Sequence, residues 1–180
     1  MDKHTEDNFA LNSDYILKQA SRYYDFAPDK LERLGSFESF VFEYNRDGKD
    51  YILRVTPGSH RQSAKIHGEL EWLNYLADNE VSVARAIEST NGSLLEIVEL
   101  DGKQVQSESS YNLVAFEKAK GRAPIQEDWN DELFTNWGSI IGRMHALTKS
   151  YQPSDPSYTR HAWHEDRDLK MRSAIPSDQT

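Results

Sequence analysis

Two strand-like segments joined by a tight turn constrain the fold of this chain more than any other part of its sequence. In residues 40–58, FVFEYNRDGKDYILRVTPG, aromatic and β-branched residues lie on both sides of Asp47-Gly48, a dipeptide typical of hairpin turns. Pro57 and Gly58 end the second segment. The pattern predicts an antiparallel hairpin, and the preceding residues 31–36, LERLGS, supply another short strand or the loop that leads into it.

Helical spacing replaces this pattern after the hairpin. In residues 59–80 apolar side chains recur every three or four positions, and Ser59 is a candidate N-terminal cap. We expect a helix that packs on the sheet through Ile66, Leu70, Leu73 and Ala77. A shorter helix, capped by Ser13 and running to about Tyr24, is expected before the first strand.

Further strands and a second long helix are expected in the rest of the chain. Residues 84–121 contain two or three strands, with tight turns at Asn91-Gly92 and Asp101-Gly102 and the most apolar segment at residues 111–116, YNLVAF. Residues 131–151 form a long amphipathic helix. The sequence thus predicts an α+β fold, in which one helix packs on an antiparallel sheet of about five strands and another helix follows.

Composition excludes several classes of protein. Thirty acidic and 21 basic residues give a net charge of −9, which argues against nucleic-acid binding because such proteins concentrate positive charge. The sequence has no cysteine, so it can form no disulfide and no thiolate site. It also has no apolar run of membrane-spanning length and no signal-peptide pattern at its N-terminus. We therefore expect a cytoplasmic protein without nucleic-acid or membrane partners.

Arg54 is an unexpected charge inside the second strand of the hairpin. Strand alternation places it on the same face as Ile52 and Thr56, where a solvated arginine needs no further explanation. A sharper interpretation is that its guanidinium faces an anion, either a phosphate or a helix carboxylate. Glu69 borders the apolar stripe of the next helix, within reach of that strand. From the residues alone, an Arg54–Glu69 pair that joins helix to sheet is favoured over a ligand site.

Five segments in a fixed order carry a resemblance to a known family. They are GSFESFVFEY, YILRV, GELEWLNYLADNEVSVARAI, NLVAFEKAKG and IIGRMHALT. Their order and spacing, from about Leu31 to Leu147, resemble the first half of the aminoglycoside phosphotransferase family, which is related to choline kinase and the protein kinases. In that family a small N-terminal lobe binds ATP, and a larger helical lobe carries the catalytic loop and the metal ligands.

The resemblance implies a division of the chain into three parts. Residues 30–118 would form a nucleotide-binding, protein-kinase-like N-terminal lobe, preceded by a helical extension in residues 1–29. Residues 119–180 would contain a connector and the first helix of an incomplete helical lobe. We expect the apolar side of that helix to be left uncovered, and so to be exposed or to promote self-association.

The resemblance also implies roles for particular residues. Arg54 corresponds to the basic residue that holds the α- and β-phosphates of ATP, and Glu69 to the helix carboxylate that pairs with it. The loop over the phosphates would contain Gly35, Ser36 and Ser39. A simple strand connection remains the alternative for this loop. The hinge whose main chain binds the adenine edge would consist of Phe116, Glu117 and Lys118.

The catalytic aspartate and the metal-binding asparagine of that family are not found. Their pattern resembles His-Gly-Asp with Asn five residues after the Asp, and His164-Glu165-Asp166 matches it only in part. Met171 stands where the asparagine is needed, and no apolar strand precedes the triplet. We interpret His161 and His164 as part of a solvated charge cluster instead of a metal site. No catalytic and no metal-binding residue is therefore assigned.

The expected function follows from the resemblance. The chain would be the nucleotide-binding part of an ATP-dependent phosphotransferase that phosphorylates a hydroxyl group of a small-molecule acceptor, with Mg²⁺ needed by the full-length parent. Without the catalytic loop and the metal motif, the chain alone is expected to be inactive. The alternative is a naturally short, non-catalytic nucleotide-binding or protein-interaction module of kinase-like fold.

Overall fold

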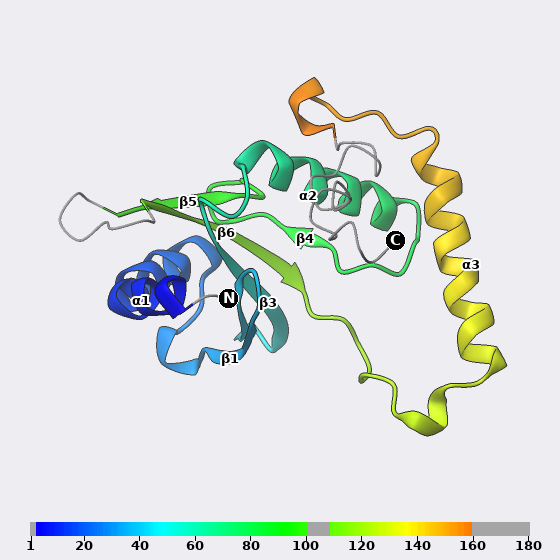
Figure 1. Ribbon diagram of the computed structural model, residues 1–180, viewed down its shortest axis with the longest axis horizontal. Helices are drawn as coiled ribbons and strands as arrows, with labels where there is room; N and C mark the ends of the chain where they lie inside the picture. Colours follow the sequence, from blue (N-terminus) through cyan, green and yellow to red (C-terminus); the bar gives the residue numbers. More distant parts are fainter. Residues whose placement is uncertain (1–2, 101–108, 160–180) are drawn as a thin grey trace, which may run out of the picture.

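An antiparallel sheet of six strands forms the centre of the computed structural model, which describes residues 3–100 and 109–159 (Figure 1). The strand order is β1-β2-β3-β6-β4, and β5 also pairs with β6. The strands are β1 (Glu32–Ser36), β2 (Phe40–Arg46), β3 (Lys49–Pro57), β4 (Ala86–Ile87), β5 (Glu96–Glu99) and β6 (Ser110–Glu117). The helices are α1 (Lys3–Tyr24), α2 (Ser63–Asp78) and α3 (Asp131–Thr148), with short 3-10 helices η1 (Pro28–Lys30), η2 (Gln126–Asp128) and η3 (Pro156–Tyr158). None of the helices in these ranges has the length and hydropathy that a bilayer crossing requires.

The β2–β3 hairpin confirms the prediction made from its turn dipeptide. Asp47 and Gly48 both have positive φ values, 54° and 76°, as a two-residue turn between twisted antiparallel strands requires. The Asn45 side chain reinforces the turn, because it accepts a hydrogen bond from the Gly48 amide at 3.1 Å and donates one to Asp50 at 2.8 Å. The register of β3 against β2 is fixed by this turn.

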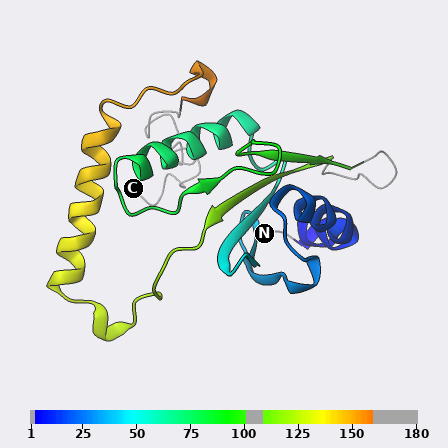
Figure 2. The same cartoon turned by 180° about the vertical axis from the view of Figure 1, so that it is seen from behind.

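The two faces of the sheet are covered by different helices (Figures 1 and 2). On one face, α1 contributes to a buried cluster in which the Phe9 ring stacks on Phe40 with a centroid distance of 3.7 Å. On the other face, α2 packs through Ile66 and Leu70. Alternation along β3 directs Leu53 toward α1 and its two sequence neighbours toward α2.

Both predicted helix caps are wrong. α1 extends well before Ser13, whose hydroxyl donates to the Ala10 carbonyl oxygen at 3.1 Å and so lies inside the helix. α2 starts later than Ser59, because a turn in which the His60 amide donates to the Pro57 carbonyl oxygen precedes it. Local side-chain identity was a poor guide here, since Ser also occurs within helices and turns.

The strands predicted in residues 84–121 are present in the structure. Residues 84–121 contain β4, β5 and β6, so the sheet has six strands where about five were expected. The predicted turn at Asn91-Gly92 is confirmed, with φ 75° at Gly92 and a 3.0 Å hydrogen bond from its amide to the Ser89 carbonyl oxygen. The turn predicted at Asp101-Gly102 and the residues discussed between His161 and Met171 lie outside the described residues.

α3 contacts α2 through its C-terminal end. Trp72 Nε1 donates to Thr148 Oγ1 at 3.0 Å, and the Tyr75 hydroxyl donates to the Leu147 carbonyl oxygen at 3.3 Å. None of the residues of α3 is buried within the described part of the chain, and the predicted exposure of its apolar side is confirmed. Its exposed apolar side chains are Phe134, Trp137, Ile140 and Ile141.

Candidate functional site

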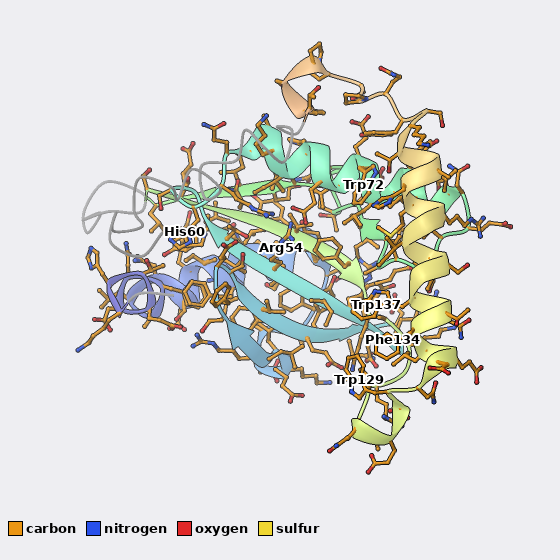
Figure 3. The ribbon with its side chains drawn as sticks, turned by 45° about the vertical axis from the view of Figure 1, so that its right-hand side comes forward. Arg54, His60, Trp72, Trp129, Phe134 and Trp137 are labelled. Atoms are coloured by element: carbon orange, nitrogen blue, oxygen red, sulfur yellow. The ribbon has the colours of Figure 1, made fainter. Side chains whose placement is uncertain are left out.

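Arg54 and Glu69 form an ion pair between the sheet and α2. Arg54 lies on the face of the sheet that α2 covers (Figure 3), in register with Val41 of β2 and Val114 of β6. Its Nη1 atom is 2.7 Å from Glu69 Oε1, and the two side chains are 19% and 14% exposed. The predicted pairing of the two side chains is confirmed, and it places a largely desolvated cation at the centre of the sheet.

Arg61 is a third member of this ion-pair cluster that the sequence analysis missed. Its Nη1 atom lies 2.5 Å from Glu69 Oε2, so Glu69 accepts from one guanidinium on each carboxylate oxygen. Arg61 lies in the connection between β3 and α2, eight residues before Glu69. Helical spacing therefore could not predict that Arg61 pairs with Glu69. The polar residues just before α2 were the sole feature of the sequence that suggested an ion-pair partner there.

The Arg54 guanidinium has donors without acceptors. Its Nε and Nη2 atoms are buried and have no hydrogen-bond partner among the described residues, while the Phe116 ring centroid lies 5.1 Å from its Cζ atom. A buried donor left unpaired costs about 1–3 kcal/mol, so native structures rarely retain one without a role. Two adjacent N–H groups on a cation fit two oxygens of a phosphate or carboxylate ligand.

A pocket of about 300 Å³ is lined in part by Arg54, and we call it the Arg54 pocket. Its lining residues are Ile52, Arg54, Glu69, Leu73, Ala84, Phe116, Glu117 and Ala119. Side chains from β3, α2 and β6 thus combine apolar walls with one ion pair. Such a site suits a ligand with a flat apolar part and an anionic end.

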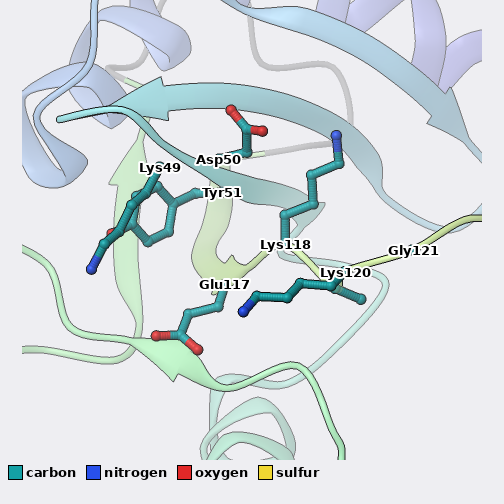
Figure 4. Close-up of a pocket in the computed structure, with 8 residues that line it drawn as sticks. Lys49, Asp50, Tyr51, Glu117, Lys118, Lys120 and Gly121 are labelled. Atoms are coloured by element: carbon teal, nitrogen blue, oxygen red, sulfur yellow. The ribbon is translucent and has the colours of Figure 1, made fainter.

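A larger pocket, of about 690 Å³, lies where the start of β3 meets the segment after β6 (Figure 4). It is lined by Lys49, Asp50, Tyr51, Glu117, Lys118, Ala119, Lys120 and Gly121. It shares Glu117 and Ala119 with the Arg54 pocket, but neither Arg54 nor Glu69 lines it. We regard the Arg54 pocket as the candidate site, because the ion-paired side chains of Arg54 and Glu69 both line it.

The hydroxyl groups expected over the phosphates have partners within the protein. Ser36 Oγ donates to Glu6 Oε1 at 2.6 Å, and Ser39 Oγ is 2.8 Å from Thr56 Oγ1. Gly35 lies in β1, beside an irregularity in its pairing with β2. None of the three predicted loop residues lines the Arg54 pocket.

The predicted hinge is divided between the two pockets. Phe116 lines the Arg54 pocket, Lys118 lines the larger one, and Glu117 lines both. The Glu117 amide donates to the Arg85 carbonyl oxygen at 2.9 Å, and the Lys118 amide donates to the Asp50 carbonyl oxygen at 3.2 Å. These two amides are therefore already used, one by the residue before β4 and the other by β3. Of the eight predicted residues, the structure brings Arg54, Glu69, Phe116 and Glu117 together around one pocket.

Comparisons with known proteins give this site a context. Residues 30–179 match the Phosphotransferase enzyme family. Amicoumacin kinase of Bacillus subtilis (strain 168) is 37% identical over 179 residues, which are 99% of this chain and 52% of that protein. A solved structure of an amicoumacin kinase in complex with AMP-PNP, Ca²⁺ and Ami has a TM-score of 0.86 and 38% identity, covering 98% of this chain and 52% of that one.

More distant solved structures share the fold. A microcompartment-associated aminopropanol kinase has a TM-score of 0.66 at 23% identity, covering 86% of this chain and 47% of that one. A spectinomycin phosphotransferase has a TM-score of 0.53 at 11% identity, covering 78% of this chain and 38% of that one. The α+β fold is kinase-like, as predicted, and the chain spans about half the length of the relatives it matches. Its family match and its identity to a curated kinase agree, and the chain belongs to the phosphotransferase enzyme family.

Proposed function

We propose that this chain is the nucleotide-binding part of an ATP-dependent phosphotransferase that phosphorylates a hydroxyl group of a small molecule. The observation that carries the proposal is Arg54, which lines a largely apolar pocket and has two buried donors without an acceptor among the described residues. The similar amicoumacin kinase structure contains the ATP analogue AMP-PNP together with Ami, which supports a nucleotide ligand and a small-molecule acceptor. The use of ATP also agrees with the cytoplasmic location expected from the sequence.

Each residue of the Arg54 pocket has a role in this proposal. Arg54 Nε and Nη2 donate to oxygens of the α- and β-phosphates, and Glu69 holds the guanidinium in place. Phe116 and Ile52 form apolar walls for the purine ring. Because the Glu117 and Lys118 amides have partners, we assign the main-chain contact with the adenine edge to the neighbouring Ala119.

The chemical step itself requires groups that this chain does not supply. Within residues 3–100 and 109–159, no cluster of three or more His, Asp or Glu side chains could hold a metal ion, and we assign none of these residues to Mg²⁺. The 180 residues also contain no His-Gly-Asp motif with an asparagine five residues after the Asp. We propose that residues 30–118 bind the nucleotide, and that the chain alone transfers no phosphate.

Calorimetric titration with AMP-PNP tests the nucleotide site. We expect Arg54→Met to weaken binding at least tenfold, because two charge-assisted hydrogen bonds to phosphate are lost while the length of the side chain is kept. Arg85→Met is the matched control, since it removes an exposed guanidinium that pairs with Asp78 instead of Glu69. Circular dichroism checks that each variant folds. Equal affinities of the wild type and Arg54→Met for AMP-PNP would remove Arg54 from the site.

A further inference from the structure

The carboxylate of Glu69 is shared between two arginines. Its Oε1 atom accepts from Arg54 Nη1 at 2.7 Å, and its Oε2 atom accepts from Arg61 Nη1 at 2.5 Å. An isolated arginine–carboxylate pair commonly forms two parallel hydrogen bonds, in which both oxygens bind the same guanidinium. Here the second oxygen accepts from Arg61 instead, and Arg54 Nη2 makes no hydrogen bond to it. Arg54 therefore makes a single hydrogen bond to Glu69.

Because the Glu69 carboxylate binds both arginines, it engages only one nitrogen of Arg54. Nε and Nη2 lie on the same edge of the planar guanidinium, and their two N–H groups point in parallel. Both atoms are buried, and neither has a hydrogen-bond partner among the described residues. We propose that Arg61 is a positioning residue, which keeps Glu69 from engaging this edge and so reserves it for two oxygens of one phosphate group. The inference rests on the proposed nucleotide function.

The backbone of Arg61 is fixed well enough for this role. Its carbonyl oxygen accepts a hydrogen bond at 3.3 Å from Asn112 Nδ2, a side chain of β6 that is buried. Asn112 Oδ1 also accepts from Ser63 Oγ at 3.2 Å, at the first residue of α2. One buried amide thus ties Arg61 and the start of α2 to the sheet. The Arg61 side chain, 37% exposed, reaches Glu69 from this anchored position.

The charge balance of the cluster agrees with the proposal. Two guanidinium groups face one carboxylate, so Arg54, Arg61 and Glu69 together carry an excess positive charge. Arg54 has little contact with water, so its two donors that lack a partner among the described residues are unfavourable until an anion arrives. A phosphate group would satisfy the donors and the charge together.

A double-mutant cycle separates positioning from direct contact with the phosphate. Calorimetry would measure the affinity for AMP-PNP of the wild type, Arg61→Met, Glu69→Gln and the double variant. We expect Arg61→Met alone to weaken binding roughly tenfold, because Glu69 then takes both Nη1 and Nη2 of Arg54. In the Glu69→Gln background, Arg61→Met should have no further effect. An equal loss in both backgrounds would overturn the proposal, because Arg61 would then act on the nucleotide without Glu69.

Two matched variants control the cycle. Arg61→Lys retains a donor for Glu69 Oε2 and is expected to keep most of the affinity. Arg85→Met removes a guanidinium of similar exposure, 36%, that binds Asp78, and should leave the affinity unchanged. Loss of affinity in Arg61→Lys equal to that in Arg61→Met would contradict a role carried by the hydrogen bond to Glu69.

A crystal structure of Arg61→Met provides a readout that needs no nucleotide. We expect Glu69 to form two hydrogen bonds to Arg54 in this variant, where the wild type forms one. If the wild type fails to bind AMP-PNP, the proposed nucleotide function is wrong, and the crystal structure still decides whether Arg61 sets the Arg54–Glu69 geometry. An Arg54–Glu69 pair that keeps its single hydrogen bond in Arg61→Met would overturn the inference.

Discussion

Glu6, in the first turn of α1, accepts a 2.6 Å hydrogen bond from the hydroxyl group of Ser36, the last residue of β1. The same carboxylate accepts from Arg33 Nη2 at 2.8 Å. α1 is therefore fastened to the strand that leads into the β1–β2 loop. The Ser36 hydroxyl can donate to a phosphate only if it leaves Glu6, so this contact bears directly on the role predicted for the loop.

The contact between Glu6 and Ser36 predicts a pH-dependent contribution to stability. The hydrogen bond from Ser36, followed by that from Arg33, holds the pKa of Glu6 below its usual value of 4.5. Because the pKa is lower in the folded state, the stabilisation is fully present above the unfolded-state pKa and is lost as the pH falls through the folded-state pKa. We expect Glu6→Gln to reduce the free energy of unfolding at neutral pH by less than about 1 kcal/mol.

Urea unfolding of the wild type and Glu6→Gln at pH 7 and at pH 3 measures this effect. The difference between the two proteins should shrink at the lower pH, because the stabilisation begins to be lost below the unfolded-state pKa of Glu6. Asp14→Asn, at an exposed position of the same helix, is the control and should differ little from the wild type at either pH. A Glu6→Gln difference that is the same at both pH values would show that the charge of Glu6 does not carry the stabilisation.

The parts of the site that can be predicted from the sequence depend on local patterns. The turn dipeptide Asp47-Gly48 sets the hairpin, strand alternation sets the face of Arg54, and helical periodicity places Glu69 beside the apolar stripe of α2. These three relations together place the carboxylate opposite the guanidinium. The order of the segments indicates the family, and the match of residues 30–179 to the Phosphotransferase enzyme family agrees with it.

The parts that cannot be predicted depend on contacts between distant segments. Arg61 reaches Glu69 because of the path of the irregular connection between β3 and α2, whose sequence has no periodic pattern that predicts this path. The partner of Ser36 comes from α1, 30 residues earlier in the chain. The Lys118 amide is used by the Asp50 carbonyl oxygen, a pairing that depends on where β6 ends against β3. Side-chain type alone therefore indicates a donor without indicating whether that donor is available.

Gly68 of α2 allows the segment around η3 to lie against the helix. A methyl group on residue 68 would overlap the Tyr158 carbonyl oxygen, and the His67 ring stacks on the Tyr158 ring with a centroid distance of 5.2 Å. Lys65 Nζ adds a 2.6 Å hydrogen bond to the Thr159 carbonyl oxygen. We expect Gly68→Ala to displace η3 from α2, since the overlapping atom belongs to the backbone and not to a flexible side chain.

Amide hydrogen exchange measures this displacement. The amides of residues 154–159 should exchange faster in Gly68→Ala, because the Ser154 amide then loses its hydrogen bonds to Glu71 on α2. Gly138→Ala is the control, since a methyl group there meets no atom within 4 Å and should stabilise α3 by roughly 0.5–1 kcal/mol. Unchanged exchange in residues 154–159 would show that α2 tolerates the added methyl group by shifting locally.

The exposed apolar side of α3 predicts dye binding and self-association. Phe134, Trp137 and Ile141 follow helical spacing and are each at least 40% exposed, so they form a continuous apolar surface. We expect the chain to bind an anilinonaphthalene sulfonate dye and to show a sedimentation coefficient that rises with concentration. Trp137→Gln combined with Ile141→Gln should reduce both, whereas Leu11→Gln on α1 should not, although Leu11 is also exposed. A strict monomer that binds no dye would contradict this prediction.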